Sequence, residues 1–210
     1  MRQLLEFLFL LPVLLLSMMA HEVAHGFIAY RLGDPTAKLH GRLTVNPLRH
    51  LDPLGSLMFV ITYLSGSFVF GWAKPVPVNP YYFRSHQRGM MATSAAGPAT
   101  NFLIAVGIAM LLNYVVPPSA IGTLLFDVMF LAYQVNVVLG VFNLVPIPPL
   151  DGSRVFGGLL PPHLYYRWAA LDRYGILFIL ALFLLLPGPF FGLLRWAFVN
   201  LSEILLPAYF

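Results

Sequence analysis

The sequence predicts an all-α polytopic membrane protein, with about five to six transmembrane segments and a small β or re-entrant element near the cytoplasmic face. Of its 210 residues, 59% are hydrophobic and only 10% are charged, whereas soluble domains average about 25% charged residues. The apolar residues also form runs long enough to cross a hydrocarbon core of ~30 Å at ~1.5 Å per helical residue. No polar stretch is long enough for a soluble domain, so residues 1–210 are expected to form one integral membrane domain.

The expected spans follow the apolar runs. The first run is expected to stay in the protein as a transmembrane helix, because it continues beyond Ala20 without a good signal-peptide cleavage site. The last two runs flank a Pro-Gly-Pro turn and form a C-terminal transmembrane pair at 174–207, after a catalytic core at 1–160. The runs are residues 4–32, 90–116, 121–144, 174–186 and 190–206.

Three segments between the spans have other patterns. Residues 37–46 alternate loosely between flanking prolines, which predicts a short strand or hairpin. Residues 73–80 contain three prolines, which favour an extended chain. Residues 54–71 are apolar but short, and Ser65-Gly66-Ser67 interrupts them. They form either a re-entrant hairpin, which enters and leaves the membrane on one side, or an ordinary further span.

The basic residues predict the topology. Ten of the 12 Lys and Arg lie in the connections at 31–52, 72–90 and 152–173, and none lies at 113–120. By the positive-inside rule, the three basic connections are cytoplasmic and the N-terminus is outside, which favours a re-entrant 54–71. The net charge of +4 is scattered over these connections, so it does not predict a nucleic-acid-binding face. The absence of cysteine excludes disulfides and thiolate metal sites.

The residues His21-Glu22-Val23-Ala24-His25 lie near the end of the first apolar run. Two histidines four positions apart leave the same face of a helix, so one zinc ion can bind both, with Glu22 beside it to transfer a proton. Ionisable side chains at membrane depth are costly and mark functional sites by default. The motif therefore predicts a metalloprotease site within the membrane.

A catalytic zinc site needs a third protein ligand and one open position. Asp151 is the candidate, because it follows an apolar run that prolines break at the depth of the two histidines. At that depth, unwound backbone and a carboxylate are tolerated only where they line a cavity or site. Capping of the following helix is the alternative role. Asp127 lies near the outer end of the span at 121–144. It is therefore ~25 Å from the inner end of that span, too far to reach the metal. A solvated or loop-bracing role is expected for Asp34, Asp52, His40, His50 and His86.

Together these residues resemble the site-2 protease family, the intramembrane zinc metalloproteases that cut transmembrane substrates. The family pairs His-Glu-x-x-His with a later Asn-x-x-Pro-x-x-x-Leu-Asp-Gly, which stands here at residues 143–152, and with Gly-Pro-x-x-Asn, at residues 97–101. Residues 51–55 and 71–80 look like a compact bacterial and archaeal branch of that family. The chain has no room for the PDZ or CBS domains that many relatives carry.

The resemblance implies an intramembrane zinc endopeptidase that cleaves transmembrane segments of membrane proteins, in regulated intramembrane proteolysis. It implies a multi-pass protein of a bacterial or archaeal plasma membrane, with its active site near the cytoplasmic face. The Zn²⁺ cofactor is expected on His21, His25 and Asp151, where it lowers the pKa of a water molecule and polarises the peptide carbonyl. Glu22 is expected to take the proton of that water and to pass it to the leaving amine.

The substrate contacts are less directly encoded. The resemblance implies that Asn143 and Asn101 hydrogen-bond the substrate, although Asn143 alternatively satisfies carbonyl groups freed by the helix break. A helical substrate must unwind before cleavage, and a strand edge beside the metal can hold the extended chain. Residues 37–46 are the preferred edge, since the prolines of 73–80 remove donors.

Two functions of other classes compete with this interpretation. Intramembrane His and Asp side chains can form the transit site of a zinc transporter or sensor, but transit needs no glutamate in the motif and usually comes with paired broken helices. The second competing function is that of an inactive membrane scaffold. Against it, every catalytic position is present in the sequence. The sequence names neither the substrate nor the oligomeric state.

Overall fold

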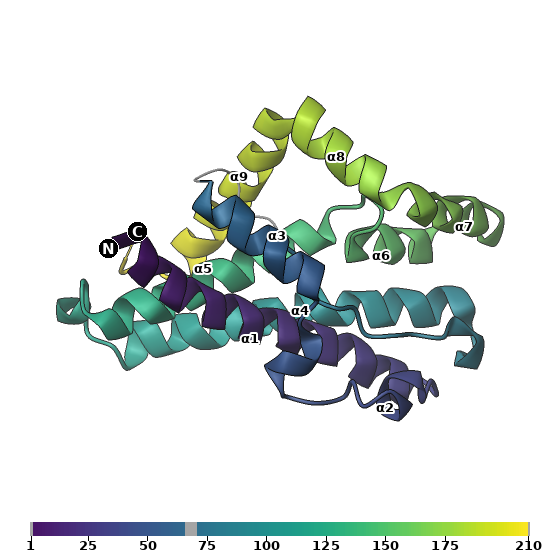
Figure 1. Ribbon diagram of the computed structural model, residues 1–210, viewed down its shortest axis with the longest axis horizontal. Helices are drawn as coiled ribbons and strands as arrows, with labels where there is room; N and C mark the ends of the chain where they lie inside the picture. The colour runs from purple at the N-terminus through teal and green to yellow at the C-terminus, as the bar shows by residue number, and fades with distance from the viewer. Residues whose placement is uncertain (1, 66–70, 210) are drawn as a thin grey trace.

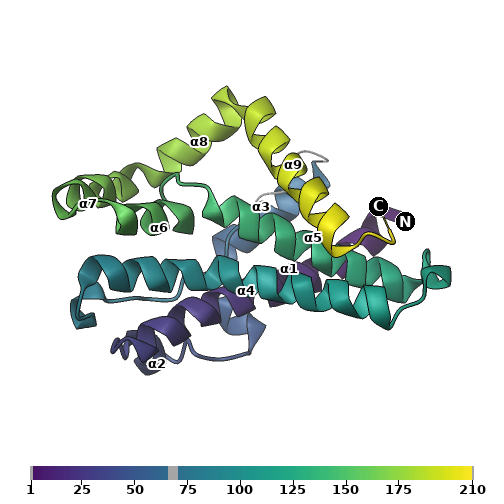
Figure 2. The ribbon, with the colours of Figure 1, turned by 180° about the vertical axis from the view of Figure 1, so that it is seen from behind.

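A computed structural model describes residues 2–65 and 71–209, which form α-helices joined by short turns (Figures 1 and 2). The helices are α1 (Arg2–Arg31), α2 (Thr36–Leu39), α3 (Pro53–Leu64), α4 (His86–Tyr114), α5 (Leu124–Leu144), α6 (Asp151–Leu159), α7 (Pro162–Ala169), α8 (Gly175–Leu185) and α9 (Pro187–Leu205). This confirms the all-α class.

Four stretches of the described residues are long and apolar enough to cross a membrane, which confirms a polytopic membrane protein. They are Phe7–Arg31 in α1, the whole of α4, the whole of α5, and Pro162–Leu185, which joins α7 to α8. The expected span at 174–186 therefore starts earlier, because helical turns already begin at Pro162. A separate crossing by α9 stays a prediction.

Helix α4 lies at the centre of the fold and packs against α1, α5 and α6. Figure 1 shows α1, α4 and α5 side by side, with α8 and α9 diverging from a sharp bend above them. Ala105 and Ala109 of α4 are buried beside Tyr133 and Val137 of α5, because small side chains let helices approach closely in a membrane. The three long helices thus form the frame that carries the site.

A second apolar cluster fixes the chain that follows α5. Val145 and Leu150, on either side of the proline-rich break, pack with Leu182 of α8 and Phe190 of α9. This burial holds the unwound segment against the C-terminal helices. It therefore determines where α6 begins.

The strand or hairpin expected at residues 37–46 is wrong. Helix α2 occupies the start of this segment, and turns around Gly41, which has a φ of 63°, follow it. The buried Asp34 accepts a hydrogen bond from the backbone N of Thr36 at 2.9 Å and stabilises the first turn. A loose alternation of apolar residues does not outweigh such local hydrogen bonds.

The two ends of the 54–71 segment lie side by side. Leu51 forms an antiparallel β-bridge with Ala73, and the backbone N of Lys74 donates to the carbonyl of His50 at 2.8 Å. Between them, α3 has 12 residues, a length of about 18 Å that is too short to cross a ~30 Å core. These contacts favour a re-entrant segment at 54–71, which stays a prediction. The expected Ser65-Gly66-Ser67 turn lies largely outside the described residues.

Candidate metal centre

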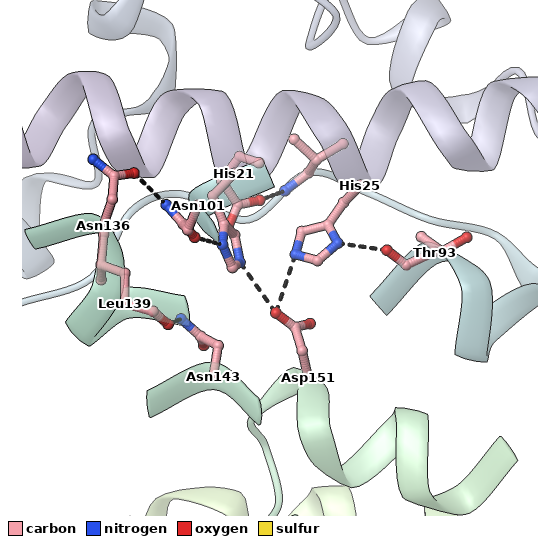
Figure 3. Close-up of polar contacts among 10 residues, drawn as sticks. His21, His25, Thr93, Asn101, Asn136, Leu139, Asn143 and Asp151 are labelled. Atoms are coloured by element: carbon pink, nitrogen blue, oxygen red, sulfur yellow. Dashed lines mark hydrogen bonds and ion pairs between the residues drawn. The ribbon is translucent and has the colours of Figure 1, made fainter. Parts of the chain in front are cut away.

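His21 and His25 project from one face of α1, as their spacing predicts (Figure 3). Their ring centroids are 4.6 Å apart, and both side chains are buried. The Nε2 atoms lie 3.1 Å and 3.2 Å from the same atom, Oδ2 of Asp151. The structure therefore brings together three side chains separated by up to 130 residues of sequence.

Asp151 is the first residue of α6, directly after the proline-rich break. The N-cap residue of α6 is Leu150, and Oδ2 of Asp151 lies against the two histidines of α1. The next residue must be glycine, because a Cβ on Gly152 would lie 2.1 Å from the carbonyl oxygen of Leu144.

The three donor atoms suit a zinc ion. All lie within 4.8 Å of one another, and two imidazoles with one carboxylate are a donor set that catalytic zinc sites use. Zinc–ligand bonds of ~2.0–2.1 Å in a tetrahedron place neighbouring ligand atoms about 3.3 Å apart. The observed separations of 3.1 Å and 3.2 Å from Asp151 are close to that value.

Hydrogen bonds to the far side of each imidazole orient the two rings. His21 Nδ1 donates to Oδ1 of Asn101 at 2.6 Å, and His25 Nδ1 donates to the backbone carbonyl of Thr93 at 2.7 Å. A proton on Nδ1 leaves the lone pair of Nε2 available for a metal. Both histidines are therefore held in the ligand form.

A buried polar chain extends from His21 into the membrane core. Asn101 Nδ2 donates to Oδ1 of Asn136 at 2.9 Å, and Asn136 Nδ2 donates to Oγ of Ser17 at 2.9 Å. Sequence reasoning missed Asn136, although an amide side chain within an apolar membrane-length helix was a usable signal. A contact of Asn101 with the substrate stays a prediction: in this structure its side chain has no exposed surface, and its oxygen accepts from His21.

Gly97 of α4 lies against both histidines. A Cβ at this position would stand 2.5 Å from Nε2 of His21 and 2.5 Å from Nε2 of His25. No real Cβ contact is that short. The first residue of the Gly-Pro-x-x-Asn element is thus needed as glycine because α4 approaches His21 and His25 closely.

Glu22 is held by the extended segment that follows 66–70. The backbone N of Val76 donates to Oε2 of Glu22 at 2.8 Å. The buried guanidinium of Arg42 donates to the carbonyls of Lys74 and Pro75, and fixes the start of this segment. Oδ2 of Asp34 accepts from the backbone N of Asn79 at 2.6 Å and fixes its end. Residues 74–79 form no helix and Asn79 has an extended backbone, whereas Pro80 begins a short 3-10 helix (Pro80–Tyr82), so the expected extended segment ends before Pro80.

Two adjoining cavities meet at the site. One, of about 400 Å³, is lined by the three donor residues together with Glu22 and Arg154. The other, of about 250 Å³, shares His21 and Glu22 and has a largely apolar wall. Asn143 lines both cavities, while its Nδ2 donates to the carbonyl of Leu139 at 3.0 Å. It is thus exposed to a substrate and also satisfies a carbonyl of its own helix.

The other candidate ligands have local roles. Asp52 caps α3 by accepting from the backbone N of Gly55 at 2.8 Å. Nε2 of His50 lies 3.0 Å from the carbonyl of Thr44. Asp127 lies in the first turn of α5, at the opposite end from Asp151. Among the described residues, the group that could hold a metal ion is His21, His25 and Asp151.

The comparisons with known proteins agree with this geometry. Residues 118–186 match the model of Peptidase family M50. The chain is 36% identical over 197 residues to "Putative zinc metalloprotease YwhC" of Bacillus subtilis (strain 168), which covers 91% of this chain and 86% of that protein. The chain belongs to peptidase family M50. It is a multi-pass membrane zinc metalloprotease of the site-2 protease type, which confirms the resemblance of its motifs.

A second relative is more distant. The chain is 31% identical over 186 residues to "Putative zinc metalloprotease Rip2" of Mycobacterium tuberculosis (strain ATCC 25618 / H37Rv), covering 88% of this chain and 70% of that protein. No solved structure matches the chain. The matched family region contains Asp151 and Asn143, while the His-Glu-x-x-His motif lies outside it.

Proposed function

We propose that this M50 protein is an intramembrane endopeptidase that cleaves transmembrane segments of membrane proteins. The observation that carries the proposal is one cavity lined by His21, His25, Asp151 and Glu22, two of which are buried in the last third of the membrane-length helix α1. Ionisable groups at that depth are expensive unless they serve a function.

The proposed chemistry divides between a zinc ion and the protein. His21, His25 and Asp151 hold the ion, which supplies Lewis acidity toward a peptide carbonyl and acidifies water. Glu22 accepts the proton of the attacking water and donates it to the leaving amine. The hydrogen bond from Val76 N to Oε2 keeps the Glu22 carboxylate at the cavity wall.

The extended segment at 72–78 is the proposed docking edge for an unwound substrate. Trp72, Ala73, Val76 and Val78 line the cavity that contains Glu22, so an extended chain laid beside them reaches the site. The sequence-based preference for residues 37–46 is abandoned. That segment starts in helix α2 and contributes no lining residue to the described cavities at the site.

The proposed entry of water is from the cytoplasmic side. Arg31 ends α1 only six residues after His25, and the basic connections 31–52 and 72–90 lie at this end. The positive-inside rule places such connections in the cytoplasm. The apolar wall of the smaller cavity, including Leu139 and Ile179, suits the side chains of a membrane-spanning substrate.

Substitution of Glu22 tests the proposal. Purified Glu22→Gln protein should keep one zinc per chain but lose cleavage of a transmembrane peptide by ~10²–10⁴-fold, since an amide cannot take the proton. Asp127→Asn is the matched control and should keep both zinc and cleavage. His21→Ala, His25→Ala and Asp151→Ala should each lose zinc by metal analysis.

The result also separates the competing functions. A transporter would move zinc into sealed vesicles, and Glu22→Gln would not stop it. A scaffold would show no cleavage even as wild-type, zinc-loaded protein. Cleavage by Glu22→Gln within tenfold of wild type would exclude Glu22 as the proton-transfer group, and full zinc occupancy in Asp151→Ala would exclude the ligand set.

A further inference from the structure

A further, larger cavity lies away from the metal centre, between the C-terminal end of α1 and the N-terminal end of α4. Its volume is about 770 Å³, within the range of small-molecule sites. Both helix ends lie on the same side of the molecule, to the right in Figure 1. It shares no lining residue with the cavities at the metal centre.

Three arginines line this cavity. Arg31 comes from the last turn of α1, while Arg84 and Arg88 flank the first turn of α4. None of the described lining residues is acidic, and no carboxylate partner is recorded for the three guanidinium groups within residues 2–65 and 71–209. Three cations around one hollow leave a concentrated positive charge that an anion can neutralise.

The start of α4 adds further donors to the same place. Ser85 caps the helix by accepting from the backbone N of Arg88, and it is one of the residues that line the cavity. The first amides of a 29-residue helix have no intrahelical acceptor and carry the positive end of its dipole. Phosphate groups bind at helix N-termini for this reason. The polar part of the cavity therefore favours a phosphate.

The position and the apolar wall indicate where that phosphate comes from. Arg31 is the last residue of one membrane-length stretch and His86 the first of another, so the cavity lies at the level of the lipid headgroups. Leu32, Phe83 and Met91 supply apolar surface next to the arginines. A free phosphate ion has no use for such a wall, whereas the glycerol and upper acyl chain of a lipid do.

We infer that this cavity binds the headgroup of an anionic glycerophospholipid, with the phosphate between Arg31, Arg84 and Arg88. The site is independent of the proposed catalytic function, because it shares no residue with the metal centre. It ties the end of the helix that carries His21 and His25 to the start of α4 through a bound lipid.

The test measures lipid retention by the full-length protein. Wild-type protein is titrated with phosphatidylglycerol in phosphatidylcholine nanodiscs and then examined by native mass spectrometry after release into detergent. Arg84→Gln/Arg88→Gln should weaken phosphatidylglycerol retention by about 25-fold, since each arginine near an anionic headgroup contributes about fivefold. Arg167→Gln/Arg173→Gln removes the same charge from exposed positions outside the cavity and should retain the lipid as wild type does.

A second variant keeps the charges and fills the space. Ala92 is exposed in the cavity wall, so Ala92→Leu should weaken retention by tenfold or more while all arginines remain. Inorganic phosphate at millimolar concentration should fail to displace the lipid. Unchanged retention in both cavity variants would overturn the inference, as would equal loss in the Arg167→Gln/Arg173→Gln control. Displacement by inorganic phosphate alone would assign the cavity to a free anion.

Discussion

Substitution of Gly97 by alanine gives a direct test of the packing at the metal centre. The added Cβ would lie 2.5 Å from Nε2 of both His21 and His25, whereas ordinary contacts begin at 3.4 Å. The two rings must therefore move by about 0.9 Å, or α4 must move away by as much. Metal sites tolerate deviations of only about 0.2 Å in ligand distance. We expect zinc affinity to fall at least a hundredfold, or about 2.7 kcal/mol.

The assay is competition with a zinc chelator, on purified protein whose helix content and thermal unfolding are measured in parallel. Gly107→Ala is the matched control, because it lies on the same helix and its Cβ would meet nothing within 4 Å. It should bind zinc as wild type does and be slightly more stable, since alanine favours a helix by about 0.5–1 kcal/mol. A folded Gly97→Ala protein that binds zinc within threefold of wild type would refute the argument that α4 and the ligands are in contact.

Three further predictions follow from the contacts around the site. Asn101→Leu should weaken zinc binding ~10–100-fold in the same competition assay, because His21 loses the acceptor that orients it; unchanged affinity would exclude this role. Val76→Pro removes the N–H donated to Glu22 and should lower kcat about tenfold with zinc content unchanged, whereas Val76→Ala, which keeps the N–H, should not. Cysteines at the exposed positions Leu48 and Lys74 should react with an impermeant reagent from one membrane face, and a cysteine at Tyr114 from the other. Reaction of Lys74→Cys from the Tyr114 side would make 54–71 a true span.

Much of the metal centre could be inferred from sequence, because its main features depend on local geometry. Histidines at positions i and i+4 must share a helix face, so His21 and His25 were predictable without a fold. The prolines before Asp151 interrupt a helix wherever it packs, and a carboxylate at such a break points to a site. The long apolar runs became α1, α4 and α5 for the same reason, since in lipid a backbone satisfies its own hydrogen bonds as a helix.

The remaining contacts were decided only by the tertiary structure. Asn101 was expected to contact the substrate, yet packing of α4 against α1 and α5 buries it between His21 and Asn136. The docking segment was expected at 37–46, but Arg42 and Asp34 hold residues 74–79 beside Glu22 instead. Each of these contacts is a hydrogen bond between a side chain and a partner 30 or more residues away in sequence. In many of them the partner is a backbone group, which every residue carries. A sequence shows which side chains can donate or accept, but only the packing of distant helices determines which backbone groups they reach.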